Sequence, residues 1–99
     1  TMTNCTQMIK QQAPGELKLL LEKLEQEVKE LLPQLPEEKR EEAAGNLELL
    51  TKASTSVKPN RSWYSVSSEG LMEASSYAKD FAGNIPGTIG SLKNLLWPG

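Results

Sequence analysis

Ser76 and Lys79 have the spacing of the Ser-x-x-Lys motif, which in some acyl-transfer enzymes places a lysine one helical turn from a serine nucleophile. The match fixes only these two residue types, and the other elements of those enzymes are missing. The sequence contains no histidine, so the commonest general base and the usual partner of a serine or cysteine nucleophile is absent. We assign no catalytic residue and expect a protein that is not an enzyme, with a small enzyme as a remote alternative.

Acidic residues and glycines offer the next candidates for chemistry. Carboxylates cluster at 22–30 and 37–42, where they could form acid/base pairs or hold Mg²⁺. We interpret both clusters as solvated helix faces, because no apolar pocket that would shift a pKa can be inferred. The glycines at 83, 87 and 90 lack the lysine and hydroxyl of a phosphate-binding loop. We therefore expect no metal and no cofactor.

The charge balance bears on the class of partner. Eleven basic and 13 acidic residues give a formal charge of -2 and a pI of about 5.2. Without a basic surplus to neutralise phosphates, a nucleic-acid partner is not expected. Cys5 is the single cysteine, so it has no partner for an internal disulfide and no companion ligands for zinc. A reduced, cytoplasmic setting fits this composition.

The elements that must position any functional side chain are helices. Ninety-nine residues leave room for one domain, and a hydrophobic fraction of 37% allows only a thin core. After a flexible or short-helical segment at 1–13, we expect a single helical domain over 14–99. Its strongest signal is an apolar stripe spaced three and four residues apart, typical of an amphipathic helix over about 16–33. The stripe consists of Leu17, Leu20, Leu21, Leu24, Val28, Leu31, Leu32 and Leu35.

The charged face of this helix is expected to be solvated, Glu27 included, with Glu25 and Lys29 as a favourable i, i+4 pair. Prolines then end it, and a second helix over about 36–53 should pack antiparallel because the connection is short. Gly45 lies inside this second helix and predicts a close helix–helix approach there. The residues expected to face inward are Ala43, Ala44, Leu47 and Leu50.

Two further helices are expected, over about 67–82 and 86–97. Ser67 would cap the first of them, with Val66 and Leu71 in the hydrophobic-staple positions. No run alternates with period two for long enough to predict a strand. The fold class is therefore all-α: an antiparallel helical hairpin with one or two C-terminal helices packed across it, as a small helical bundle.

Trp63 and Tyr64 are large side chains in a chain with few aromatics. We expect Trp63 to anchor the C-terminal half against the hairpin, the alternative being that both rings stay exposed as a partner-binding pair.

Small residues recur one turn apart from Gly70 through Ala74 and Ala78 to Ala82, and Gly83 and Gly87 continue the series. They predict close helix packing, within the fold or between copies. The candidate interaction residues are Leu17, Leu24, Leu31, Trp63, Tyr64, Gly70, Ala74, Ala78, Gly83, Gly87 and Trp97.

The segment 81–97 carries Lys93 as its only charge. It is too short and glycine-rich for a confident membrane span, and core packing is the favoured interpretation. Docking on a membrane surface is the alternative, which would make the protein peripheral to the membrane.

Three stretches, at 31–38, 46–53 and 58–74, resemble a short helical module that ends many cyanobacterial and other bacterial multidomain proteins. The most specific part is Trp-Tyr-x-x-Ser-x-Glu-Gly-Leu-x-Glu-Ala over 63–74, and the likeness covers roughly 16–97. In those proteins the module follows signalling or conflict-system parts, including regions associated with a TRADD-N-like domain. The resemblance implies a regulatory or assembly role beside an effector and supplies no catalytic residue. Asn84, Pro86 and Gly90 depart from the smoother tail of the family.

The expected function is protein–protein association, including association with itself, in a bacterial signalling or defence protein. The alternative is a membrane-associating module that acts through its C-terminal helix at 81–97.

Overall fold

The computed structural model describes residues 15–56, 58–78, 81 and 83–98. The segment predicted at 1–13 lies outside the described residues. The described part contains four α-helices: α2 (Gly15–Leu31), α3 (Glu37–Thr55), α4 (Arg61–Ser76) and α5 (Ile85–Leu96). A short 3-10 helix, η1 (Leu32–Gln34), follows α2 directly and contains Pro33.

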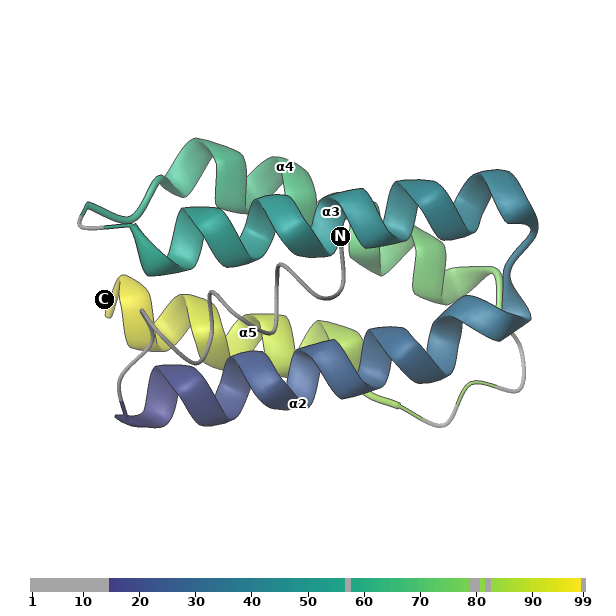
Figure 1. The fold of residues 1–99 in the computed structure, drawn as a ribbon. Helices are drawn as coiled ribbons and strands as arrows, with labels where there is room; N and C mark the ends of the chain where they lie inside the picture. The colour runs from purple at the N-terminus through teal and green to yellow at the C-terminus, as the bar shows by residue number, and fades with distance from the viewer. Residues whose placement is uncertain (1–14, 57, 79–80, 82, 99) are drawn as a thin grey trace.

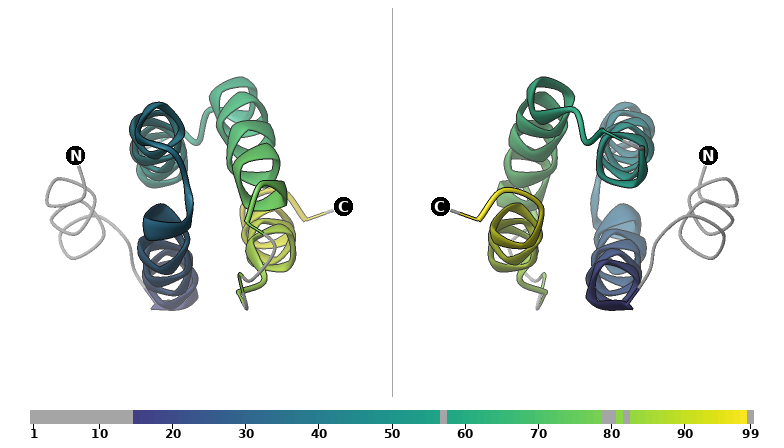
Figure 2. Two further views of the ribbon diagram at one scale, coloured as in Figure 1. Left: turned by 90° about the vertical axis from the view of Figure 1, so that its right-hand side faces the viewer. Right: turned by 90° about the vertical axis from the view of Figure 1, so that its left-hand side faces the viewer.

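The helices form an up-and-down bundle in which each helix runs antiparallel to the next (Figure 1). Viewed end-on, α2 and α3 form one layer and α4 and α5 the other (Figure 2). The most extensive packing is between the layers, of α3 on α4 and of α2 on α5. The predicted all-α helical bundle is thus confirmed. Its hairpin of α2 and α3 exists, but each of these helices packs more closely on a C-terminal helix than on the other.

The core draws apolar side chains from all four α-helices. The leucine stripe of α2 is a main contribution. Of the inward positions expected on α3, Ala43, Leu47 and Leu50 are buried, whereas Ala44 is half-buried. Leu35, in the connection between these helices, adds one more side chain. The buried core residues are Leu21, Leu24, Val28, Leu31, Leu35, Ala43, Leu47, Leu50, Ala53, Tyr64, Leu71, Ala74, Ile85, Ile89 and Leu92.

The start of α4 differs from the prediction. The cap is Asn60, whose side chain accepts a hydrogen bond from the Trp63 backbone N–H at 3.0 Å. Ser67, the predicted cap, lies inside the helix, and its hydroxyl donates to the Trp63 carbonyl at 2.8 Å. Val66 is 63% exposed and so cannot form the predicted staple. The helix also ends at Ser76, six residues before the predicted end.

Gly45 does not mark a close helix–helix approach, so that prediction is wrong. The residue is exposed in the middle of α3, and a Cβ built on it would meet nothing within 4 Å. Gly70 of α4 is the glycine that lies against a neighbouring helix, because a Cβ there would overlap the side-chain amide of Asn46 on α3. The glycine at a close contact between α3 and α4 is therefore Gly70 and not Gly45.

Candidate interaction surfaces

Tyr64, and not Trp63, anchors α4 in the bundle. Tyr64 is 2% exposed, and its hydroxyl donates a hydrogen bond to the Ile89 carbonyl of α5 at 2.6 Å. Its ring packs in a T-shaped arrangement with that of Trp97, at a centroid distance of 5.1 Å and an interplanar angle of 74°. Burial raises the pKa of the Tyr64 phenol well above its ordinary value. Trp63 is 52% exposed, which contradicts its prediction as the anchor.

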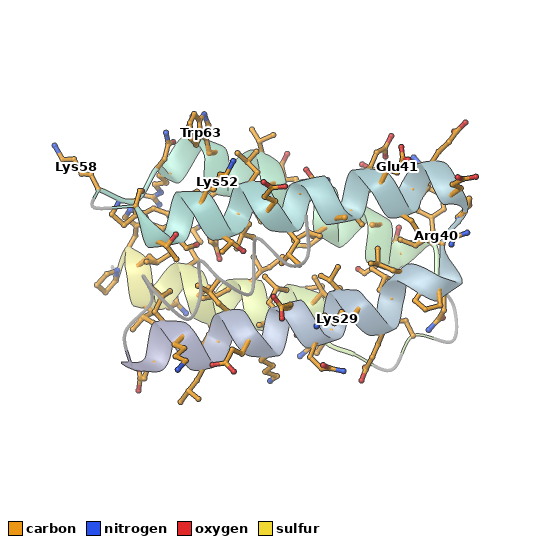
Figure 3. All side chains as sticks on the ribbon, in the orientation of Figure 1. Lys29, Arg40, Glu41, Lys52, Lys58 and Trp63 are labelled. Carbon is orange, nitrogen blue, oxygen red and sulfur yellow. The ribbon has the colours of Figure 1, made fainter. Side chains whose placement is uncertain are left out.

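Trp63 belongs to a line of residues along the outer face of α4, all of them exposed except Gly70, which is half-buried beside Asn46 of α3. Its members follow at intervals of three and four, which places them on one side of the helix. We call this line the α4 outer stripe: Trp63, Val66, Gly70, Glu73 and Tyr77. Figure 3 shows Trp63 projecting from α4 at the rim of the bundle. With Val66 and Tyr77, it accounts for three of the five large hydrophobic side chains that the described residues leave exposed.

The two ends of the surface formed by α3 and α4 carry opposite charge. Lys52 and Lys58 lie at the end that holds Trp63, while Glu41 lies at the opposite end (Figure 3). Arg61, the first residue of α4, adds to the basic end. Glu37, Glu38 and Glu42 of α3 and Glu73 of α4 add to the acidic end.

Lys39 and Arg40 also lie at this acidic end, and cations at both ends have contacts within the chain. At the basic end, Lys52 lies 3.5 Å from a Glu48 carboxylate oxygen and Arg61 lies 5.9 Å from the ring centroid of Trp97. The Lys39 ammonium lies 3.5 Å from a Glu42 carboxylate oxygen and 5.1 Å from the ring centroid of Tyr77. The Arg40 Nε donates to the Leu35 carbonyl at 3.1 Å.

A groove between α2 and α5 is the second apolar surface. It has a volume of about 510 Å3 and lies between the start of α2 and the end of α5. Leu19, 69% exposed, and Leu95 supply exposed apolar side chains there. The other lining residues are Glu16, Leu20, Ser91 and Asn94.

Glu27 is buried, contrary to the expectation that it lies on a solvated face. One carboxylate oxygen accepts a hydrogen bond from the Asn84 backbone N–H at 2.6 Å, and the other accepts from the Thr88 hydroxyl at 2.5 Å. Both donors belong to the first turn of α5 or its cap, where unpaired N–H groups favour a negative charge. Glu27 thus caps a helix that lies far from it in sequence. The predicted pair of Glu25 and Lys29 does form, at 3.5 Å.

Several predicted interaction residues are part of the protein's own core. Leu24, Leu31 and Tyr64 are buried, as is Ala74, so none of them is available on the surface. The small residues Gly70 and Ala74 face α3, which agrees with packing within the fold.

The remaining predicted residues lie nearer the surface. Leu17, Ala78 and Trp97 are half-buried against the core. A Cβ on Gly83 would overlap the Phe81 ring, and one on Gly87 would overlap the Asn84 side chain. Ala82 lies outside the described residues.

The candidates for catalysis are not brought together. Ser76 donates its hydroxyl to the Glu73 carbonyl at 2.6 Å, and Lys79 lies outside the described residues. Within the described ranges, no group of three or more potential metal-ligating side chains forms.

No known protein family, curated protein or solved structure matches this sequence. The likeness to the bacterial helical module therefore stays a prediction drawn from the pattern at 63–74. None of the helices in the described part of the chain combines the length and apolar character needed to cross a membrane.

Trp63 and Gly70 are the members of the α4 outer stripe that were predicted from the sequence as interaction residues, and Val66, Glu73 and Tyr77 were missed although a signal for them exists. Val66 and Tyr77 stand three and fourteen residues after Trp63, and a helix that starts at Arg61 with Asn60 as its cap places all three on one face. The role of Glu27 had no such signal, because its two hydrogen-bond partners lie 57 and 61 residues away.

Proposed function

We propose that this protein is an association module that binds other protein chains, copies of itself included. The observation that carries the proposal is the α4 outer stripe, where Trp63, Val66 and Tyr77 stay exposed although the core beneath them is closed. Exposed aromatic side chains grouped on one helix face are typical anchors of protein interfaces. The setting that we propose for this activity is a bacterial signalling or defence protein, on the strength of the resemblance at 63–74.

The burial of the leucine stripe changes the basis of this proposal. Leu24 and Leu31 of the α2 stripe were predicted as interaction residues, but they and their neighbours are covered by the protein's own helices. Association would therefore use surfaces that remain after folding. Two such surfaces exist in the described part of the chain, the α4 outer stripe and the α2–α5 groove.

The proposal is tested by the mass of the protein in solution. Light scattering on the purified chain, from low micromolar to hundreds of micromolar, should give a mass that rises above 10.9 kDa with concentration. A mass that stays at the monomer value across this range would contradict self-association.

Membrane docking through the segment at 81–97 is the second candidate function. In its favour, α5 is apolar along one side, with Lys93 as its only charge. However, Ile85, Ile89 and Leu92 of that side are buried in the bundle, so α5 would have to leave α2 before it could enter a bilayer. Co-sedimentation with anionic liposomes separates the two functions, because an association module remains in the supernatant.

A further inference from the structure

We infer that two copies of this chain associate face to face through their α4 outer stripes, antiparallel and around a two-fold axis that passes Gly70. The inference rests on the proposed function and names the partner and the surface that it uses. It follows from three features of the described residues: the composition of the stripe, the equal spacing of its two aromatic ends from Gly70, and the distribution of charge along α3 and α4.

The stripe has the composition of a small interface. Trp63, Val66 and Tyr77 are each more than half exposed, and together they extend along the whole of α4. These three side chains are large and uncharged, whereas the other exposed positions of α4 are Arg61, Ser62, Ser65, Glu69, Glu73 and Ser76. A contact of this size belongs with the weaker associations, which bury less than about 1,200 Å2 in total.

The two aromatic ends of the stripe lie at equal distances from its middle residue. Gly70 lies seven residues after Trp63 and seven before Tyr77. An antiparallel second copy centred on Gly70 therefore places Trp63 of one chain against Tyr77 of the other, twice over. The axis passes the level of Gly70 and of the Asn46 side chain that packs against it, and each contact across the axis occurs twice.

The charges on the neighbouring helix support the same arrangement. Asn46 of α3 lies beside Gly70, and it marks the level of the axis on that helix. Lys52 lies six residues after Asn46 and Glu41 five residues before it, on the two sides of this level (Figure 3). The rotation therefore brings the basic end of each copy over the acidic end of the other, with Lys52 near the second copy's Glu41. An anionic membrane would be repelled by the acidic end, so a second copy fits this surface better.

The decisive experiment compares two matched substitutions in the full chain. Val66→Glu places a charge in the stripe, and Leu19→Glu places the same charge at an equally exposed aliphatic position in the α2–α5 groove. Circular dichroism and urea unfolding of both variants establish that the bundle is folded. We expect Val66→Glu to raise the dissociation constant of the dimer by at least about tenfold and Leu19→Glu to leave it unchanged within about twofold.

A charge reversal tests the orientation of the two copies. Lys52→Glu should weaken the dimer, and the added substitution Glu41→Lys should restore it, because the two positions exchange sign together. Restoration in the double variant supports the antiparallel arrangement, and its absence overturns it.

The outcomes separate the inference from the proposed function. If the wild-type protein associates and Leu19→Glu breaks the dimer while Val66→Glu does not, the inference is overturned. The association function stays in place in that case. A wild-type monomer at all concentrations overturns both. Binding of the wild-type chain to anionic vesicles that is lost in Val66→Glu identifies the stripe as a lipid surface and overturns the inference as well.

Discussion

Glu27 of α2 and Thr88 of α5 are joined by a hydrogen bond of 2.5 Å between the Thr88 hydroxyl and the Glu27 carboxylate, across 61 residues of sequence. The same carboxylate accepts the Asn84 backbone N–H at the cap of α5. The contact fixes the start of α5 on the side of α2, beside the apolar packing of Ile85. A polar contact therefore sets where the last helix begins along the bundle.

Removing the Glu27 carboxylate should destabilise the protein. Glu27→Ala leaves the Asn84 N–H and the Thr88 hydroxyl without their acceptor, which costs about 1–3 kcal/mol for a buried polar group. Urea unfolding followed by circular dichroism measures the change. Glu30→Ala, at an exposed position one turn away, should change the free energy of unfolding by less than about 0.5 kcal/mol. Equal effects at the two positions would show that the cap contributes nothing to stability.

The two faces of α2 provide a second comparison. Leu24 is fully buried, so Leu24→Ala should lower the free energy of unfolding by about 2–5 kcal/mol, through lost apolar burial and the cavity that remains. Leu19→Ala, on the exposed face, should change it by less than about 0.5 kcal/mol. The same unfolding experiment measures both. A loss at Leu19 as large as that at Leu24 would mean that the buried stripe is assigned to the wrong side.

The helices with strong apolar periodicity could be predicted from the sequence. The leucines of α2 recur every three to four residues, and burial of that stripe is the main source of helix stability in a folded chain. The predicted pair of Glu25 and Lys29 followed from spacing alone and is present. Local rules were sufficient wherever the partners of a residue lie within a turn or two of it.

The start of α4 was missed because its first two turns are rich in serine. Serine is usually read as a cap or a loop residue, since its hydroxyl competes for backbone hydrogen bonds. In α4 the hydroxyls of Ser67 and Ser68 donate to the carbonyls of Trp63 and Ser65 in the preceding turn, so they are compatible with the helix interior. The candidate site was affected in turn, because a helix begun at Ser67 leaves Trp63 outside its pattern.

Gly45→Ala should stabilise the protein. Gly45 lies in the interior of α3 with open space around its Cα, so alanine adds no clash and removes the entropic cost of a helical glycine. We expect a gain of about 0.5–1 kcal/mol in the free energy of unfolding. Gly70→Ala is the matched control, since its Cβ would displace the Asn46 side chain and so should gain less. A loss of stability at Gly45 would indicate that this position is covered in solution.

Because of the Tyr64 hydroxyl, the free energy of unfolding should decrease as the pH rises in the alkaline range. The pKa of this hydroxyl is raised above the ordinary value of 10.0 by burial, so the folded state holds its proton more tightly than the unfolded chain does. Below pH 10 the phenol is protonated in both states, and its full contribution to the free energy of unfolding is present. As the pH rises from 10 through the folded-state pKa this contribution is lost, because the unfolded chain gives up the proton first.

Tyr64→Phe removes both this titration and the hydrogen bond to the Ile89 carbonyl. At neutral pH the variant should therefore unfold more easily than the wild type, by about 0.5–1.5 kcal/mol. Above pH 10 the difference should shrink, since only the wild type loses stability through the phenol. Urea unfolding of both proteins at neutral pH and at several values above pH 10 measures this difference directly, and titration of lysines affects both proteins alike. A difference that stays constant with pH would show that the phenol ionises equally easily in the folded and the unfolded chain.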